Sequence, residues 1–472
     1  MDCVRQTHGF HVDRMVPISR LPDELIAMIF EEGHRSSSFQ PPDRPLEILV
    51  SQVARRWQKV AAQTPRLWRM IRITTSGMPC EVLAQYLLKS MPLTLNIMAE
   101  VGDRRDLGRK NVAIDYFQTL IQHIDRWGHI SILSHSSSGI HRLFTWMSSI
   151  AAPSLHTMHI YFMNDGPSAD YVYGNSDIFK GGAPLLTTFR VRGISLQRWL
   201  PPLAALTTLH LHETFHEWDS KPTYDQMRQM LSGLTELTHL IVYGRIVKHL
   251  PAEPPANMIE LGVLRSLSIR ISEADFNLDR SCRLLMVVSA PLLECLVLED
   301  ITDKTFSPLC RTSEFRSGRQ KFPELRVLSI RPVEFNPFPV TELFATLPGV
   351  THFSIIEGDA DAYLEPLVST TPNTIPPWPE LQSLTLSDFC VTEGPTAFPR
   401  RLIAARMAIG HPIRTLRLSR KFLYEDGLRP GDLEWLRKHL VLEELHSYST
   451  ADDGNYTVQW PDSDELESWV HA

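Results

Sequence analysis

The chain has 472 residues, of which 43% are hydrophobic and 21% charged, a composition typical of a globular protein and not of a disordered one. Its formal net charge of -7 and its pI near 6.3 exclude a general attraction to nucleic acid. The six cysteines form no Cys-x-x-Cys pair, the N-terminus has no apolar signal block, and the most apolar run, Leu284 to Leu293, is too short for a membrane span. We expect a soluble intracellular protein, cytoplasmic or nuclear, that binds no membrane and no nucleic acid.

Residues 18–69 are predicted to form a helical module, preceded by a flexible N-terminus over residues 1–17. A helix should begin at Pro22, because proline lacks the N–H that would be unpaired there and the acidic residues that follow complement the helix dipole. Its apolar residues fall on two faces, with Leu21, Leu25, Met28 and Ile29 in one row and Ile26 and Phe30 in another. So small a module cannot cover both faces of its own helices, and we expect a partner to cover one of them.

The rest of the module is predicted to be helical as well. Gly33 and the polar residues after it end the first helix, and Pro45 can open the next. The apolar positions of the second helix are Leu46, Leu49, Val50, Val53, Trp57, Val60 and Ala61. A break near Ala54 into two shorter helices is an equal alternative, and the module closes with Pro65-Arg66-Leu67-Trp68.

These positions resemble the F-box, a short helical module that opens with Leu-Pro, continues with Glu-Leu and an aliphatic-Phe pair, and often closes with Leu-Trp. The matching residues are Leu21-Pro22, Glu24-Leu25, Ile29-Phe30, Leu49 to Val53, Trp57 and Leu67-Trp68. The loop before Pro45 is longer than usual for the family, and Ala54 stands where the family often has cysteine. The resemblance implies docking on a Skp-family adaptor and, through it, on a cullin. The adaptor contacts that it implies are Leu21, Pro22, Glu24, Leu25, Ile29, Phe30, Leu49, Val50, Val53, Trp57 and Trp68.

A pattern of the form apolar-x-x-apolar-x-apolar recurs through residues 70–447 at intervals of about 20 to 35 residues, the range of leucine-rich repeats. Its copies are Trp68/Ile71/Ile73, Pro92/Leu95/Ile97, Trp127/Ile130/Ile132, Leu155/Met158/Ile160, Leu186/Phe189/Val191, Leu206/Leu209/Leu211, Leu237/Leu240/Val242, Leu264/Leu267/Ile269, Leu293/Leu296/Leu298, Leu325/Leu328/Ile330, Val350/Phe353/Ile355, Leu381/Leu384/Leu386, Ile413/Leu416/Leu418 and a fading copy at Leu442/Leu445. Each copy should end in a short strand, and helical stretches between copies, such as Glu81 to Lys89 and Tyr224 to Ser232, should form an outer layer.

The predicted fold is therefore α/β, a helical module followed by an irregular solenoid that resembles leucine-rich repeats, with a parallel sheet on its concave side. The buried asparagine of that family is not kept, since Met163, Ile194, Ile301 and Phe389 stand at its position. Residues 164–182 and 358–379 are expected to be loops, and residues 448–472 an acidic tail.

One catalytic string is present. His212-Glu213-Thr214-Phe215-His216 matches His-Glu-x-x-His, which in zinc proteases lies on a helix. Here it directly follows an expected strand, so we predict that it crosses a turn and binds no metal. His156 and His159 have a metal-like spacing, but on a strand they point to opposite faces. No phosphate-binding loop or nucleophile motif occurs, and we expect neither enzymatic activity nor a cofactor.

The concave face of the solenoid is the expected binding surface. Outward strand positions there include Tyr161, Arg190, Arg192, His210, Tyr243, Arg270 and Arg331. Arginine and tyrosine are enriched where binding energy concentrates, so this surface favours an acidic or phosphorylated segment of a partner protein. The alternative is that exposed strand positions are polar for solubility alone.

The function that follows is that of a non-enzymatic substrate receptor of an SCF-type ubiquitin ligase. The helical module would bind the adaptor, and the repeats would hold a target protein close to the conjugating enzyme. Two alternatives stay open: a solenoid scaffold with no role in a ligase, in which the N-terminal hairpin packs on its own repeats, and a zinc hydrolase built on His212 and His216.

Overall fold

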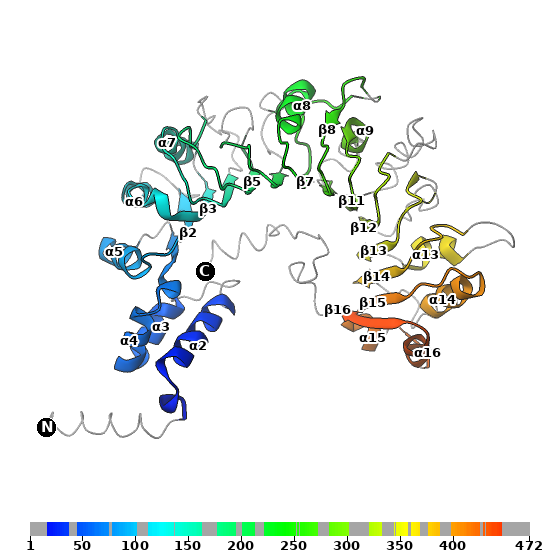
Figure 1. The fold of residues 1–472 in the computed structure, drawn as a ribbon, viewed down its shortest axis with the longest axis horizontal. Helices are drawn as coiled ribbons and strands as arrows, with labels where there is room; N and C mark the ends of the chain where they lie inside the picture. The colour runs from blue at the N-terminus through cyan, green and yellow to red at the C-terminus, as the bar shows by residue number, and fades with distance from the viewer. Residues whose placement is uncertain are drawn as a thin grey trace.

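The computed structural model forms an arch, with strands along its inner edge and helices along its outer edge (Figure 1). It describes residues 17–36, 45–74, 78–101, 112–135, 137–162, 177–194, 201–212, 221–251, 253, 255–271, 283–301, 321–332, 344, 346–356, 360–368, 376–387, 398–424, 428–429 and 431–445. The expected N-terminus over residues 1–16 and the expected acidic tail lie outside these ranges. The α/β class and the long parallel sheet of the prediction are confirmed.

The helical module forms one foot of the arch (Figure 1). Its elements are η1 (Pro17–Arg20), α2 (Asp23–Ser36), α3 (Leu46–Val53), α4 (Arg55–Ala62) and η3 (Pro65–Trp68). The first helix begins one residue after Pro22, passes through Gly33 and ends at Ser36, inside the polar run that was predicted to close it. Ala54 is extended, with φ -155° and ψ 155°, which interrupts the helical hydrogen bonds. The alternative of two shorter helices is therefore confirmed.

All fourteen predicted repeat copies carry a strand of one parallel sheet, in which each strand pairs with its neighbours along the chain. The strands are β1 (Met70–Ile73), β2 (Leu95–Val101), β3 (Trp127–Ser134), β4 (Thr157–Phe162), β5 (Thr188–Arg192), β6 (Thr208–His212), β7 (His239–Tyr243), β9 (Ser266–Arg270), β11 (Cys295–Ile301), β12 (Val327–Pro332), β13 (His352–Ile356), β14 (Ser383–Ser387), β15 (Thr415–Ser419) and β16 (Val441–Leu445). The short strands β8 (Ile259–Glu260) and β10 (Val288–Ser289) pair with each other on the outer side.

One row of core side chains runs in register through the whole sheet. It consists of Ile71, Ile97, Ile130, Met158, Phe189, Leu209, Leu240, Leu267, Leu296, Leu328, Phe353, Leu384, Leu416 and Leu442. All but the last are buried, since each side chain packs between its two neighbours in the stack. The second copy departs from the prediction, because Ile97, two residues after the expected Leu95, lies opposite Ile71 and Ile130.

The outer layer is more helical than predicted. Its helices are α5 (Cys80–Lys89), α6 (Val112–Ile121), η4 (Ile124–Arg126), α7 (Ser137–Met147), α8 (Tyr224–Ser232), α9 (Leu284–Val287), α13 (Ala360–Val368), α14 (Phe398–Ala408), α15 (Arg420–Tyr424) and α16 (Asp432–His439). The segment over residues 358–379, expected to be a loop, contains α13 and is a wrong prediction. At the position of the missing asparagine, Ile194 and Ile301 are buried and fill the interior with apolar side chains.

Buried tryptophans tie the outer layer to the strands. The indole N–H of Trp68 donates to the carbonyl of Ala61, and that of Trp127 donates to the carbonyl of Leu120, in each case seven residues back at the end of a helix. A helix end leaves carbonyls without intrahelical partners, and a buried indole needs an acceptor. Each of these carbonyls also accepts a backbone N–H, from Thr64 or from His123, so the indole is a second donor that satisfies its own need for an acceptor and holds the tryptophan against the end of the helix. No helix in the described part of the chain is long and apolar enough to cross a membrane.

Candidate functional site

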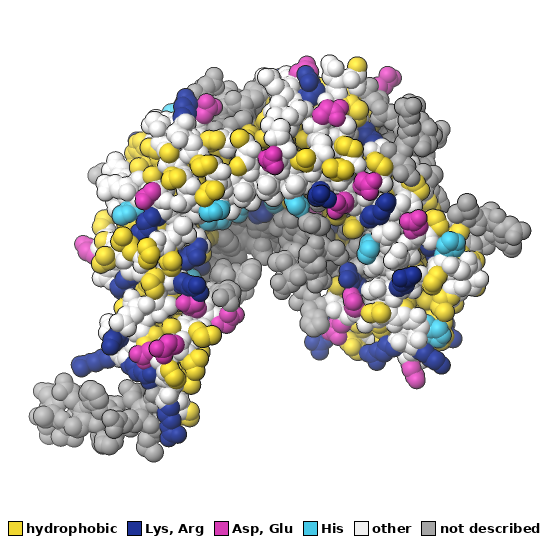
Figure 2. Space-filling model, viewed as in Figure 1, with side chains coloured by type: hydrophobic (Ala, Val, Ile, Leu, Met, Phe, Trp, Pro, Cys, Tyr) yellow, Lys and Arg dark blue, Asp and Glu magenta, His cyan; other side chains and the backbone are white. Residues whose placement is uncertain are grey.

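The helical module exposes apolar side chains on one face, which we call the apolar helix surface: Leu25, Met28, Ile29, Leu49 and Val53. The first three share one face of α2, because they are spaced i, i+3 and i+4, and the last two share one face of α3. The opposite row of α2, Ile26 and Phe30, is buried. Figure 2 shows hydrophobic side chains gathered over the foot of the arch where α2 lies. The predicted two-faced helix is confirmed, with one face inside the module and one outside.

Cross-links between helices hold this surface in place. The Arg56 guanidinium of α4 donates to Asp23 Oδ1 at 2.7 Å and also to the Leu21 carbonyl, so the start of α2 is fixed. The ring of Phe30 packs edge-on against Trp57, with 5.1 Å between ring centroids. Arg66 forms an ion pair with Glu31 at 3.2 Å. These contacts join α2 to α4 and η3, so the helix that carries the exposed apolar residues is fixed in place.

The predicted adaptor contacts divide into two groups in the structure. Pro22, Glu24, Leu25, Ile29, Leu49 and Val53 are exposed, and Leu21 and Trp57 are partly buried. Phe30, Val50 and Trp68 are buried in the module's own core, with exposed fractions of 3%, 6% and 2%. Their assignment as contacts is corrected here, since a side chain enclosed by its own module supports the surface and does not form it. Met28, at 63% exposed, belongs to the surface instead.

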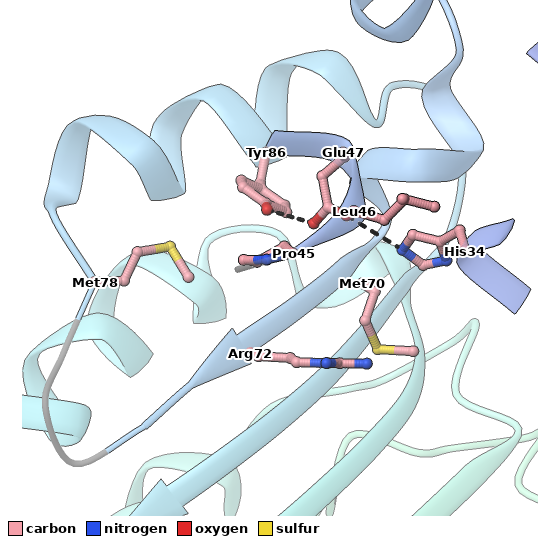
Figure 3. Close-up of a pocket in the computed structure, with 8 residues that line it drawn as sticks. All are labelled: His34, Pro45, Leu46, Glu47, Met70, Arg72, Met78 and Tyr86. Atoms are coloured by element: carbon pink, nitrogen blue, oxygen red, sulfur yellow. Dashed lines mark hydrogen bonds and ion pairs between the residues drawn. The ribbon is translucent and has the colours of Figure 1, made fainter. Parts of the chain in front are cut away.

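A buried carboxylate joins the module to the first repeat (Figure 3). Glu47 of α3 accepts a hydrogen bond of 2.5 Å from the Tyr86 hydroxyl of α5, and its other oxygen lies 3.6 Å from His34 Nε2. Burial, the Glu47 charge and this hydrogen bond raise the pKa of Tyr86, while burial lowers the pKa of His34 despite the carboxylate. The adjoining cavity of about 50 Å³ has room for little more than water, so we interpret this network as structural.

The concave face of the arch carries three rows of outward side chains, set by the parallel register. On β3 to β7 the first row is His129, Thr157, Thr188, Thr208 and His239, the second is Ser131, His159, Arg190, His210 and Ile241, and the third is Leu133, Tyr161, Arg192, His212 and Tyr243. These five strands contain no aspartate or glutamate. Figure 2 shows histidine and basic side chains along this inner edge. We call this surface the basic concave face.

Arg190 is at the centre of that face. Its Nη1 donates to the Tyr161 hydroxyl at 3.2 Å, and its strand partners are His159 on one side and His210 on the other. His159 packs edge-on against His129, with ring centroids 4.9 Å apart. Burial and then the Arg190 charge lower the pKa of His129 to about 4, and the same two causes hold the pKa values of His159 and His210 well below their usual range. The histidines are neutral at pH 7, and the cation among them makes the local potential positive.

The predicted target-binding residues all lie on the concave strands, but none of them is fully exposed. Tyr161, Arg192 and His210 are buried, which corrects the expectation that they are open surface positions, and Arg190, Tyr243, Arg270 and Arg331 are partly buried. The Arg270 guanidinium is engaged by Asp300 at 2.6 Å and by Glu299 at 3.8 Å, so acidic neighbours already offset its charge. Arg190 and Arg192 lie on β5, between β4 and β6, strands that contain no aspartate or glutamate.

The sequence reading missed part of this face. His129 is not among the predicted binding residues, and His159 was considered only for its spacing from His156. The strand register brings His159 beside His129 and Arg190, and this contact depends on which residues of distant repeats face each other. The signal available in the sequence was the absence of acidic residues from five consecutive strands, each with histidine or arginine.

The catalytic string does not have the geometry of a zinc protease at its first histidine. His212 is the last residue of β6, and its ring lies against Tyr243 with 4.0 Å between centroids. The signature needs its first histidine on a helix, and His212 is instead in a strand, one residue earlier than the expected turn. The remaining residues, Glu213 to His216, lie outside the described residues. Among the described residues no group of three or more His, Cys, Asp or Glu side chains is placed to hold a metal ion.

Comparison with known proteins gives no assignment. No family model matches the chain, and no curated protein matches it. One solved structure with some likeness is a crystal structure of a protein from Bacteroides fragilis, with 14% sequence identity, a TM-score of 0.32, and coverage of 76% of this chain and 76% of that one. A likeness of this size carries no argument, so the residues of this chain are the basis for any functional proposal.

Proposed function

We propose that this chain is a substrate receptor of an SCF-type ubiquitin ligase, in which the helical module docks on a Skp-family adaptor and the solenoid holds a target protein. The receptor performs no chemistry itself. It brings a target and a conjugating enzyme together, and this proximity turns a bimolecular transfer into a local one.

The observation that carries the proposal is the apolar helix surface. Five of the fourteen exposed large apolar side chains among the described residues lie within residues 25–53, on two adjacent helices. Clustered exposed apolar residues mark interaction sites, whereas scattered ones are normal. Four of the five, Leu25, Ile29, Leu49 and Val53, are also matching positions of the F-box resemblance. Geometry and motif thus favour the same face.

The target surface in this proposal is the basic concave face. Its cations, tyrosines and neutral histidines suit an acidic or phosphorylated segment, because guanidinium groups bind carboxylate and phosphate oxygens with charge-assisted hydrogen bonds. The sheet arranges these groups along five neighbouring strands at a spacing of about 5 Å, so an extended peptide could contact several strands.

The experiment is co-purification of the full chain with a Skp-family adaptor. We expect the wild-type chain to bind, and a Leu25→Glu, Ile29→Glu variant to lose binding at least 100-fold, because each charge would be placed against an apolar partner surface. A matched control is Leu185→Glu, at a solenoid side chain that is 46% exposed, close to the 48% of Ile29. Circular dichroism of all three proteins shows whether they are folded.

A folded wild-type chain that does not bind the adaptor would overturn the proposal. The scaffold without ligase function would then be favoured, since the buried Glu47 and Tyr86 contact already lets the module cap the first repeat. Adaptor binding that survives Leu25→Glu, Ile29→Glu, or that is lost equally in Leu185→Glu, would show that the apolar helix surface is not the docking site.

A further inference from the structure

Most of the net negative charge of this protein comes from one segment of its sequence. Residues 446–472 contain six acidic residues and no lysine or arginine: Asp452, Asp453, Asp462, Asp464, Glu465 and Glu467. Subtracting this -6 from the net charge of -7 leaves -1 for residues 1–445. A partner for the basic concave face must be acidic, and the chain itself contains a segment of that character.

We propose that the acidic segment over residues 446–472 docks on the basic concave face of its own chain and competes there with other acidic ligands. The inference shares its surface with the target site of the proposed function, and it rests on that part of the proposal. It does not require the adaptor.

Charge complementarity is the first argument. The five strands β3 to β7 carry Arg190, Arg192 and five histidines, and no aspartate or glutamate. Arg190 lies between His159 and His210 on the neighbouring strands, and after burial its charge is the next cause that lowers the pKa values of His129, His159 and His210, so a carboxylate here would meet a cation. The segment also contains Tyr456 and Trp460, aromatic rings of the kind that pack on imidazole and guanidinium groups.

Reach is the second argument. The segment starts directly after Leu445, the last residue of β16, which is nine strands from β5 along the sheet. At about 4.8 Å per strand this path is about 43 Å, and the curvature of the arch makes the direct distance shorter. The 17 residues from position 446 to Asp462 can extend to about 55 Å. The acidic residues from Asp462 onwards can therefore reach Arg190.

Tethering makes even a weak contact effective. A segment on the same chain as its site has an effective concentration set by the length of chain between them, so a site whose Kd is near that concentration is half filled in cis. A free acidic ligand then has to displace the segment. The basic concave face would bind the acidic segment when no other ligand is present, and a ligand that binds more tightly would displace it.

The test uses the full chain and a labelled synthetic peptide of residues 446–472 as the probe, with binding followed by fluorescence anisotropy. In one variant the six acids are replaced by their amides, Asp→Asn at positions 452, 453, 462 and 464 and Glu→Gln at 465 and 467. We expect this neutral-segment chain to bind the probe at least tenfold more tightly than the wild-type chain. Adding Arg190→Gln to it should weaken binding at least tenfold, and Arg437→Glu, on the outer helix α16, should not.

Three results overturn the inference: equal affinity of the wild-type and neutral-segment chains, binding that does not change with Arg190→Gln, or no binding by the neutral-segment chain. Arg190→Gln keeps a hydrogen-bonding side chain, and circular dichroism establishes that the variant folds. Co-purification with the adaptor is measured on the same proteins. If adaptor binding persists while the probe result fails, only this inference falls, and if the adaptor fails while the probe binds as expected, only the ligase role falls.

Discussion

Arg190 adds to the effect of burial on the protonation state of the histidines beside it. A guanidinium is always charged at neutral pH, so a neighbouring imidazole that gains a proton meets a like charge in a partly dehydrated setting. His129, His159 and His210 are kept neutral for this reason, with burial as the larger cause in each case. Neutral imidazoles can both donate and accept hydrogen bonds, which widens the set of polar groups that this face can contact.

The lowered pKa values predict an acid-sensitive fold. Because the folded-state pKa of each histidine is below the unfolded value near 6.5, the unfolded chain binds more protons, and the stability present above pH 6.5 is lost as the pH falls. For His129, with a pKa of about 4, the loss continues to about pH 4 and amounts to about 2 kcal/mol by pH 5. Urea midpoints at pH 7.5 and pH 5 measure it.

Removal of the titrating groups provides the control. The variant His129→Gln, His159→Gln should show a smaller drop in urea midpoint between the two pH values, whereas His156→Gln, at an exposed position before β4, should show the wild-type drop. An unchanged drop in the double variant would mean that other groups cause the acid sensitivity.

At the level of the strand and its turn, Gly193 limits what the chain can tolerate. It follows β5 with φ +76°, and a Cβ there would lie 2.3 Å from the carbonyl oxygen of Phe162 at the end of β4. Neighbouring repeats therefore approach too closely at this corner for any side chain. The positive φ alone would already disfavour other residues.

Gly193→Ala and Gly410→Ala separate the two effects. Gly410 has a nearly identical φ of +78°, but nothing lies within 4 Å of its Cβ position. We expect Gly410→Ala to cost about 1 kcal/mol from the backbone conformation, and Gly193→Ala to cost about 3 kcal/mol or more, since the Phe162 carbonyl must move as well. Chemical denaturation measures both, and equal losses would contradict the steric argument.

The strands were predictable from the sequence because each copy of the repeat contains its own local signal. The apolar spacing of Leu264, Leu267 and Ile269, for example, already places β9. The helix α13 was not predicted because Pro366 and the proline- and threonine-rich residues after it favoured a loop. The burial of Phe30 and Trp68 also required tertiary information, since a helical pattern identifies two apolar faces but not which of them meets its own core.

On the scale of the molecule, a buried polar contact joins the helical module to the arch. Glu47 is 3% exposed, and the Tyr86 hydroxyl is the hydrogen-bond donor to it from the first repeat. Trp68 packs edge-on against the same tyrosine, with 5.1 Å between centroids, beside that hydrogen bond. The direction in which the apolar helix surface faces, relative to the concave face, depends on this joint.

Tyr86→Phe should loosen the joint without unfolding either part. Loss of the hydroxyl leaves a buried carboxylate short of a donor, at a cost of about 1–3 kcal/mol. Hydrogen exchange should show faster exchange in α3 and unchanged protection in β11 and β12. Tyr224→Phe is the matched control, since that hydroxyl donates to the Asn257 carbonyl far from the module, and it should leave α3 unchanged. Equal exchange in α3 for both variants would show that the hydroxyl does not hold the module.

The series of parallel strands also allows the arch to bend. Each strand of the main sheet pairs only with its neighbours, so the fourteen strands form thirteen junctions in series. In a repeat stack, small changes at successive junctions add, and a rotation of about one degree at each would turn one foot by about 13° relative to the other. A bound ligand that bridges several strands would stiffen only the junctions it spans. The distance between the helical module and the far end of the arch could thus change while every core residue keeps its neighbours.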